Sequence, residues 1–175
     1  MLVGGRSRRM GRDKAALPFR GGTLAGAVAL AVQEAAGSAI LVGNPEHGGI
    51  PDLYPGEGPL GGILTALHHT SAEWNLIVAC DMPEVTASFL KGLLETARRR
   101  RCGVLLPLGP GGRPEPLCAV YRRAVRDTLE RRFAEGIRKI TEAFEGLEVA
   151  SLTVAEVAQF QNVNTPQDWS VYAAE

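Results

Sequence analysis

Apolar residues recur along the chain at two alternating spacings. A spacing of three or four residues predicts helices at 23–36, 63–69, 86–97, 125–133 and 137–144, and Gly37 is placed to end the first of them. Short continuous apolar runs predict buried strands at 39–42, 75–80, 103–108 and 117–121, and an edge strand at 147–152. Near the C-terminus, Thr165-Pro166-Gln167-Asp168 combines an N-cap, a proline in the first turn and an acid at the third helical position, which predicts a terminal helix.

The alternation of strands and helices predicts a single α/β domain over residues 1–175. Strands with near-continuous apolar character are covered on both faces, so we expect a three-layer sandwich, a mostly parallel sheet with helices on both faces. Ligands of such sheets bind beyond the carboxyl ends of the strands, where the loops after residue 3, after Gly43 and at Asp81 should gather. The range 47–62 holds six glycines and three prolines, and we expect a functional loop there.

Composition narrows the class of protein. The chain has 175 residues, of which 45% are hydrophobic and 22% charged, with a formal net charge of zero, as in a soluble globular domain. No apolar run approaches the roughly 20 residues of a membrane span, and arginines stand where a signal peptide would be apolar, so we expect a cytoplasmic protein. The balanced charge argues against nucleic acid as a partner. The three cysteines and three histidines lack the spacing of a disulfide framework or a zinc site.

Positive charge is concentrated near the N-terminus. Residues 1–20 contain one acid, Asp13, and six cations, namely Arg6, Arg8, Arg9, Arg12, Lys14 and Arg20. Two apolar residues run into a glycine pair there, which predicts a strand that opens into a basic loop able to hold a triphosphate. In that loop Lys14 can place a point charge on the phosphates and Arg9 can donate two hydrogen bonds. A simple turn with a solvated charged face is the alternative, and neither a P-loop nor a G-x-G-x-x-G pattern is present.

Asp81 follows an apolar strand within Ala79-Cys80-Asp81-Met82-Pro83. A carboxylate at the end of a strand suits Mg²⁺, which takes one or two carboxylates together with substrate phosphates. The alternative is an aspartate that caps the next turn.

The stretch Leu2-Val3-Gly4-Gly5-Arg6-Ser7-Arg8-Arg9-Met10-Gly11-Arg12-Asp13-Lys14 resembles the L-x-G-G-x-S-x-R-M-G-x-D-K signature of the molybdenum cofactor guanylyltransferases, within the nucleotide-diphospho-sugar transferase superfamily. That family usually has Ala at the position of Val3 and several strand residues before Leu2. Only Met1 precedes Leu2 here, so the first strand is very short or the reading frame begins too late. Four more segments resemble family elements in the same order: Gly58-Pro59-Leu60-Gly61-Gly62, Cys80-Asp81-Met82-Pro83, Arg113-Pro114-Glu115-Pro116-Leu117 and Asn162-Val163-Asn164-Thr165-Pro166.

The resemblance implies transfer of GMP from GTP to the terminal phosphate of Mo-molybdopterin, with release of pyrophosphate. It implies catalytic roles for Arg9, Lys14 and Asp81, with Mg²⁺ on Asp81. The implied GTP-binding residues are Leu2, Val3, Gly4, Gly5, Lys14, Asn44, Asp52, Gly58, Pro59 and Asp81. The implied second-substrate residues are Arg113, Asn162 and Asn164.

By the resemblance, Asp52 matches the family residue that reads guanine. A carboxylate can accept hydrogen bonds from both the N1–H and the exocyclic amine of guanine. An aspartate in a proline-bounded turn is the alternative there, and Asn44 matches the family only approximately. Two other functions stay open: a related nucleotidyltransferase that uses CTP or a sugar 1-phosphate acceptor, and a non-catalytic nucleotide-binding module. Proteins that deliver molybdopterin or accept the product are further partners that the resemblance implies.

Overall fold

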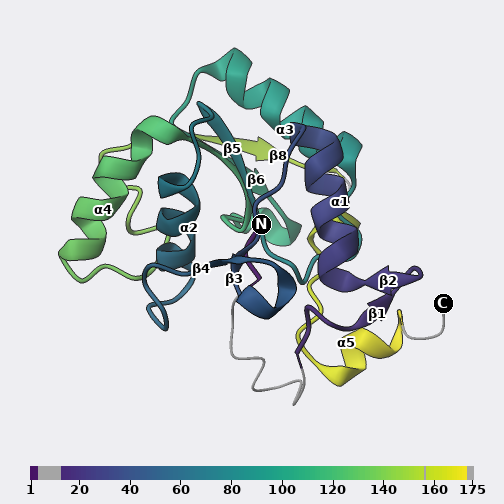
Figure 1. The fold of residues 1–175 in the computed structure, drawn as a ribbon. Coiled ribbons are helices and arrows are strands. Elements are labelled where there is room, and N and C mark those ends of the chain that lie inside the picture. The colour runs from purple at the N-terminus through teal and green to yellow at the C-terminus, as the bar shows by residue number, and fades with distance from the viewer. Residues whose placement is uncertain (4–12, 156, 173–175) are drawn as a thin grey trace.

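The computed structural model describes residues 1–3, 13–155 and 157–172 (Figure 1). The helices are α1 Leu24–Ala36, α2 Pro59–His68, α3 Ala87–Arg100, α4 Arg126–Ala134 and α5 Pro166–Ser170. The strands are β1 Pro18–Phe19, β2 Gly22–Thr23, β3 Val42–Gly43, β4 Ile50–Pro51, β5 Trp74–Val78, β6 Val104–Leu108, β7 Cys118–Arg122 and β8 Val149–Thr153. Short 3₁₀ turns lie at Pro45–His47, Pro110–Gly112, Arg123–Val125 and Val157–Phe160. None of the described helices combines the length and apolar character needed to cross a membrane.

The main sheet is mixed, with the strand order β5-β7-β6-β8. Strand β7 runs antiparallel to both β5 and β6, whereas β6 and β8 are parallel. The prediction of alternating strands and helices in one α/β fold is confirmed, but a mostly parallel sheet is not. Only the nine residues 109–117 join β6 to β7, and a parallel return needs a crossover of a dozen residues or more, so β7 turns back antiparallel.

Residues 1–3 connect this sheet to the parallel pair β3 and β4. Leu2 forms parallel bridges with Val42 in β3 and with Ala79 just after β5. The amide of Leu2 donates to the Val78 carbonyl at 2.8 Å, and the Cys80 amide donates to the Leu2 carbonyl at 3.1 Å. The short N-terminal segment therefore lies between β3 and the end of β5, so the carboxyl ends of residues 1–3, β3 and β5 lie at one edge.

Helices cover both faces of the sheet (Figure 1). Successive residues of a strand point to opposite faces, and β5 shows the result: Leu76 and Val78 pack into one core with α1 and α3, and Ile77 packs into the other with α2 and α4. Tyr121 of β7 lies in the second core and is completely buried. The two cores fix the sheet between the helix pairs.

Several predicted helix ends are confirmed by their caps. The hydroxyls of Thr23 and Thr86 accept hydrogen bonds at the starts of α1 and α3, and Gly37 ends α1 with a φ of 84°. At the start of α5, Thr165 and Asp168 form a complete capping box. Each of these signals depends on residues within a few positions of one another, so the sequence reveals them directly.

One prediction was wrong in extent and another in kind. The loop expected at 47–62 contains β4 and the first turn of α2, which begins at Pro59 and not at residue 63. Proline suits the first helical turn, and Gly61 is buried where an added Cβ would lie 2.9 Å from the Tyr54 Cβ. The helix expected at 137–144 does not form: Gly136 has a φ of 90°, residues 137–139 have no regular structure, and turns at 140–146 still place Ile140 in the core.

Candidate active site

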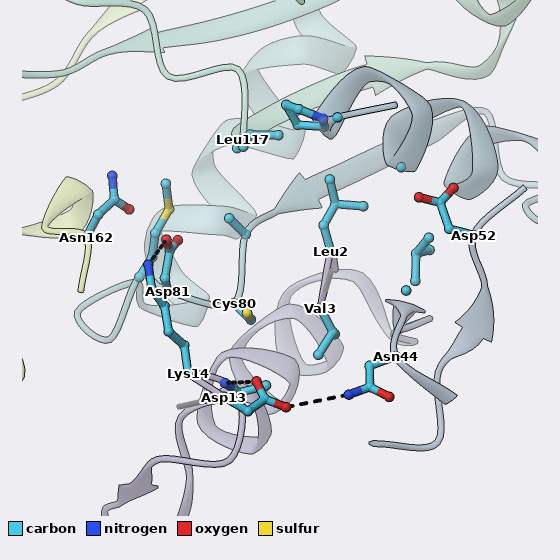
Figure 2. A pocket seen from close by; sticks show the side chains of 18 of the residues that line it. Leu2, Val3, Asp13, Lys14, Asn44, Asp52, Cys80, Asp81, Leu117 and Asn162 are labelled. Carbon is cyan, nitrogen blue, oxygen red and sulfur yellow. Dashed lines mark hydrogen bonds and ion pairs between the residues drawn. The ribbon is translucent and has the colours of Figure 1, made fainter. Parts of the chain in front are cut away.

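Residues at the carboxyl ends of segment 1–3, β3 and β5, together with residues 13–15, line a cleft of about 1410 Å³ (Figure 2). The structure brings ten of the predicted site residues to this cleft: Leu2, Val3, Lys14, Asn44, Asp52, Gly58, Pro59, Asp81, Asn162 and Asn164. Three others, Gly4, Gly5 and Arg9, lie outside the described residues. Residues from widely separated parts of the chain thus share one site, as the gathering of these loops predicts.

Lys14 and Asp81 face each other at one end of the cleft (Figure 2). The Lys14 Nζ lies 3.5 Å from Asp81 Oδ2 and donates to Asn164 Oδ1 at 2.8 Å. The two charged side chains are 15% and 23% exposed. Burial raises the pKa of the Asp81 carboxyl, and the Lys14 ammonium opposes that effect only in part. A further cation beside Asp81 would therefore stabilise the charged form of its carboxyl.

The C-terminal segment is tied to this end of the cleft by backbone hydrogen bonds. The Val163 amide donates to the Asp81 carbonyl at 2.9 Å. Asp168 Oδ2 accepts from the amides of Asn164 and Thr165, each at 2.8 Å, and these bonds lower the pKa of Asp168. The capping box of α5 thus also orients Asn164, the partner of Lys14.

Asp52 lies at the other end of the cleft, and Leu2 and Val3 lie between it and the Lys14–Asp81 pair (Figure 2). Its Oδ1 accepts from the Tyr54 amide at 3.0 Å and from the Thr65 hydroxyl at 2.6 Å. Within the described chain, Asp52 Oδ2 makes no hydrogen bond. The carboxylate is therefore held by one oxygen and leaves the other for a ligand.

Thr65 was not anticipated as part of the site. It is completely buried in α2, and its hydroxyl accepts from the Leu53 amide at 3.0 Å while it bonds to Asp52. The sequence gives no signal of this contact, because Thr65 follows Asp52 by thirteen positions on an apolar helix face. The contact forms only when α2 packs against the residues that follow β4.

Asn44 is fixed by its own turn. Its Oδ1 accepts from the Glu46 amide at 2.9 Å, and its Nδ2 lies 3.5 Å from Asp13 Oδ2 (Figure 2). Asp13 also lines the cleft and accepts from the Ala15 amide at 3.0 Å. Asp13 belongs to the motif that contains Lys14 but was not predicted as a site residue.

The Arg113-Pro114-Glu115 segment places a different residue in the cleft from the one expected. Arg113 is exposed and is not among the residues that line the cleft, so the structure does not bring it together with the other predicted residues. Glu115 does line the cleft. Burial raises the pKa of Glu115, Arg113 lowers it, and Asp81 raises it. Glu115 belongs to the segment that resembles the family, but substrate binding was predicted for Arg113 alone.

The donor set suits a metal ion that arrives with phosphates. Among the described residues no three His, Cys, Asp or Glu side chains gather as a metal cluster. Mg²⁺ is usually held by one or two carboxylates, with phosphate and water oxygens completing its shell. Asp81 can supply such a carboxylate, so the residues present fit Mg²⁺ bound together with a nucleotide.

A family model described as the MobA-like NTP transferase domain matches residues 1–149. The chain belongs to this family. It is 35% identical to a probable molybdenum cofactor guanylyltransferase of Methanothermobacter thermautotrophicus, over 96% of this chain and 94% of the relative. It is 33% identical to the molybdenum cofactor guanylyltransferase of Xanthomonas euvesicatoria, over 97% and 90%. The resemblance seen in the sequence motifs is confirmed.

A solved structure extends the family likeness to the fold. The crystal structure of molybdopterin-guanine dinucleotide biosynthesis protein A from Archaeoglobus fulgidus superposes with a TM-score of 0.81 at 31% identity. The match covers 98% of this chain and 94% of the Archaeoglobus protein. The mixed sheet described above is therefore part of an α/β nucleotidyltransferase-like fold.

Proposed function

We propose that this protein is a molybdenum cofactor guanylyltransferase, which transfers GMP from GTP to the terminal phosphate of Mo-molybdopterin and releases pyrophosphate. The observation that carries the proposal is that one cleft contains Asp52 at one end and the Lys14–Asp81 pair at the other. Membership of the MobA-like family and the names of the relatives support the same reaction.

The two ends of the cleft would bind different parts of GTP. At the base end, Asp52 Oδ2 would accept hydrogen bonds from the N1–H and the exocyclic amine of guanine, which cytosine and adenine do not offer together. At the phosphate end, the Lys14 ammonium would neutralise the β- and γ-phosphates. Leu2 and Val3 line the cleft between the two ends and would lie along the nucleoside. Arg9, Gly4 and Gly5 keep their predicted roles in phosphate binding, outside the described residues.

The chemical step needs positioning and charge neutralisation more than acid–base chemistry. No covalent enzyme intermediate is needed. The attacking phosphate of the second substrate is already an anion, so the task of the protein is to position it and to neutralise charge. Asp81 would hold Mg²⁺, which offsets charge on the reacting phosphates when it is bound. Asn162 and Asn164 line the cleft beside Asp81 and would contact Mo-molybdopterin; the Asn162 Oδ1 is buried and makes no hydrogen bond within the described chain.

The reaction can be tested by pyrophosphate release with Mo-molybdopterin, Mg²⁺ and each of GTP, CTP, ATP and UTP. We expect turnover with GTP. A clear preference for CTP would overturn the guanine assignment and favour the related cytidylyl reaction. Absence of pyrophosphate with every nucleotide would favour the non-catalytic binding module.

Asp81→Ala tests the metal assignment within this reaction. We expect turnover to fall by at least about 100-fold, because the charge of the reacting phosphates loses its fixed counter-ion. Asp127→Ala is the matched control, since Asp127 is 80% exposed on α4 and outside the cleft. Circular dichroism spectra should show both variants folded. Wild-type rates for Asp81→Ala in Mg²⁺ would show that Asp81 does not hold the metal.

A further inference from the structure

The proposed metal ligand already has a cation beside it. Asp81 Oδ2 is 3.5 Å from the Lys14 Nζ, on the side of the cleft where Asn164 also accepts from that ammonium at 2.8 Å. The ammonium therefore already occupies part of the space around the oxygen that would hold a metal ion.

A metal ion and this ammonium cannot share the site at low cost. Both Lys14 and Asp81 are more than three-quarters buried as side chains, at 15% and 23% exposure. In a partly buried site the repulsion between a divalent cation and an ammonium a few ångströms away is much stronger than in bulk water. No other cation is paired with Asp81 in the described chain, so the competition for its oxygen lies between Lys14 and the metal.

A triphosphate offers the ammonium a better partner. Its oxygens carry several negative charges, and lysine reaches them by rotation about its flexible four-carbon stem. Movement of the ammonium toward the phosphates uncovers Asp81 Oδ2, and the same phosphates supply the remaining oxygen ligands that Mg²⁺ prefers.

We infer that Lys14 takes the place of the divalent cation in the nucleotide-free protein, and that nucleotide phosphates must draw its ammonium from Asp81 before the metal binds there. Free metal then binds weakly to the empty enzyme, and metal and nucleotide strengthen each other's binding by the same factor. The inference rests on the proposed function only in requiring that a nucleoside triphosphate and a divalent cation enter this cleft.

Mn²⁺ binding to the full chain without nucleotide tests the exchange, with free Mn²⁺ followed by electron paramagnetic resonance. Lys14→Met removes the charge, keeps the length of the side chain and adds no oxygen ligand. We expect it to bind Mn²⁺ about tenfold more tightly than wild type, within the usual range of coupling between sites. Lys14→Arg keeps the charge and should show no gain. Lys139→Met is the matched control, because Lys139 is 69% exposed and pairs with Glu142.

A double variant locates the effect. Adding Asp81→Asn to Lys14→Met should abolish the gained Mn²⁺ binding, and thermal melts should show every variant folded before titration. The inference fails if folded Lys14→Met binds Mn²⁺ no more tightly than wild type, or if the gain survives Asp81→Asn. Its failure is separate from that of the proposed function: a preference for CTP in turnover leaves the exchange intact, whereas unchanged Mn²⁺ affinity leaves GTP turnover intact.

Discussion

The base end of the cleft can be tested by changing Asp52 to Asn. The inner oxygen of Asp52 faces two donors, the Tyr54 amide at 3.0 Å and the Thr65 hydroxyl at 2.6 Å. In Asp52→Asn the amide oxygen must take this inner position, because an NH₂ group there would face donors. The NH₂ group is then turned toward the cleft, where the wild-type carboxylate oxygen would accept from guanine. The substitution thus exchanges an acceptor for a donor at one atom.

The expected loss follows from the two hydrogen bonds that Asp52 Oδ2 would accept. A hydrogen bond to a charged group is worth roughly 1.5–3 kcal/mol, so losing both costs about 3 kcal/mol at the lower figure. That energy corresponds to a fall of about 150-fold in kcat/KM for GTP. ITP lacks the exocyclic 2-amine and forms only one of the two bonds, so we expect wild type to favour GTP over ITP by roughly tenfold and Asp52→Asn to show almost no preference.

The measurement is steady-state pyrophosphate release at varied GTP and varied ITP, with wild type, Asp52→Asn and the exposed control Asp127→Asn. The control should keep the wild-type ratio of GTP to ITP. If Asp52→Asn keeps that ratio too, even with a lower activity for both nucleotides, then Asp52 does not read the 2-amine and the assignment of the base end is wrong.

Two further predictions concern stability. Gly61→Ala should lower the free energy of unfolding by about 1–3 kcal/mol, because the new Cβ would lie 2.9 Å from the Tyr54 Cβ. Gly92→Ala in α3 has open space and should raise the free energy of unfolding by up to about 1 kcal/mol. Urea unfolding compares the two variants, and equal stabilities would refute the contact with Tyr54. Asp168→Asn should lower the Tm at pH 7. The folded pKa of Asp168 lies below its ordinary value of 3.8, so its contribution is present above that value and is lost as the pH falls through the folded pKa; a Tm difference that persists unchanged in strong acid would contradict this.

Helix ends were predictable where the signal is local. Thr23, Thr86 and the Thr165–Asp168 box each satisfy free amides within their own first turn, and Gly37 closes α1 at a positive φ. These hydrogen bonds and backbone angles depend on neighbours in the chain and so can be read without knowing the fold.

Segments whose state depends on distant packing were predicted less well. The glycines of the range 47–62 suggested a loop, yet Gly61 and Gly62 lie in α2. Tyr54 and Leu2 pack in the space that side chains at these two positions would need, so the glycines serve close packing there. The apolar spacing at 137–144 suggested a helix, but Ile140 reaches the core through turns. In both places the local preference does not decide the structure that forms.

The sequence by itself determined the family and predicted ten residues that line the cleft, because the segments around Lys14, Asp81 and Asp52 specify residue types at short spacing. Only the tertiary structure decided which of these groups meet: Lys14 and Asp81 lie 67 positions apart and come within 3.5 Å, Thr65 selects the free oxygen of Asp52, and Glu115 enters the cleft while Arg113 does not. Such contacts depend on how the helices pack on the two faces of the sheet, and short-range spacing carries no record of that packing.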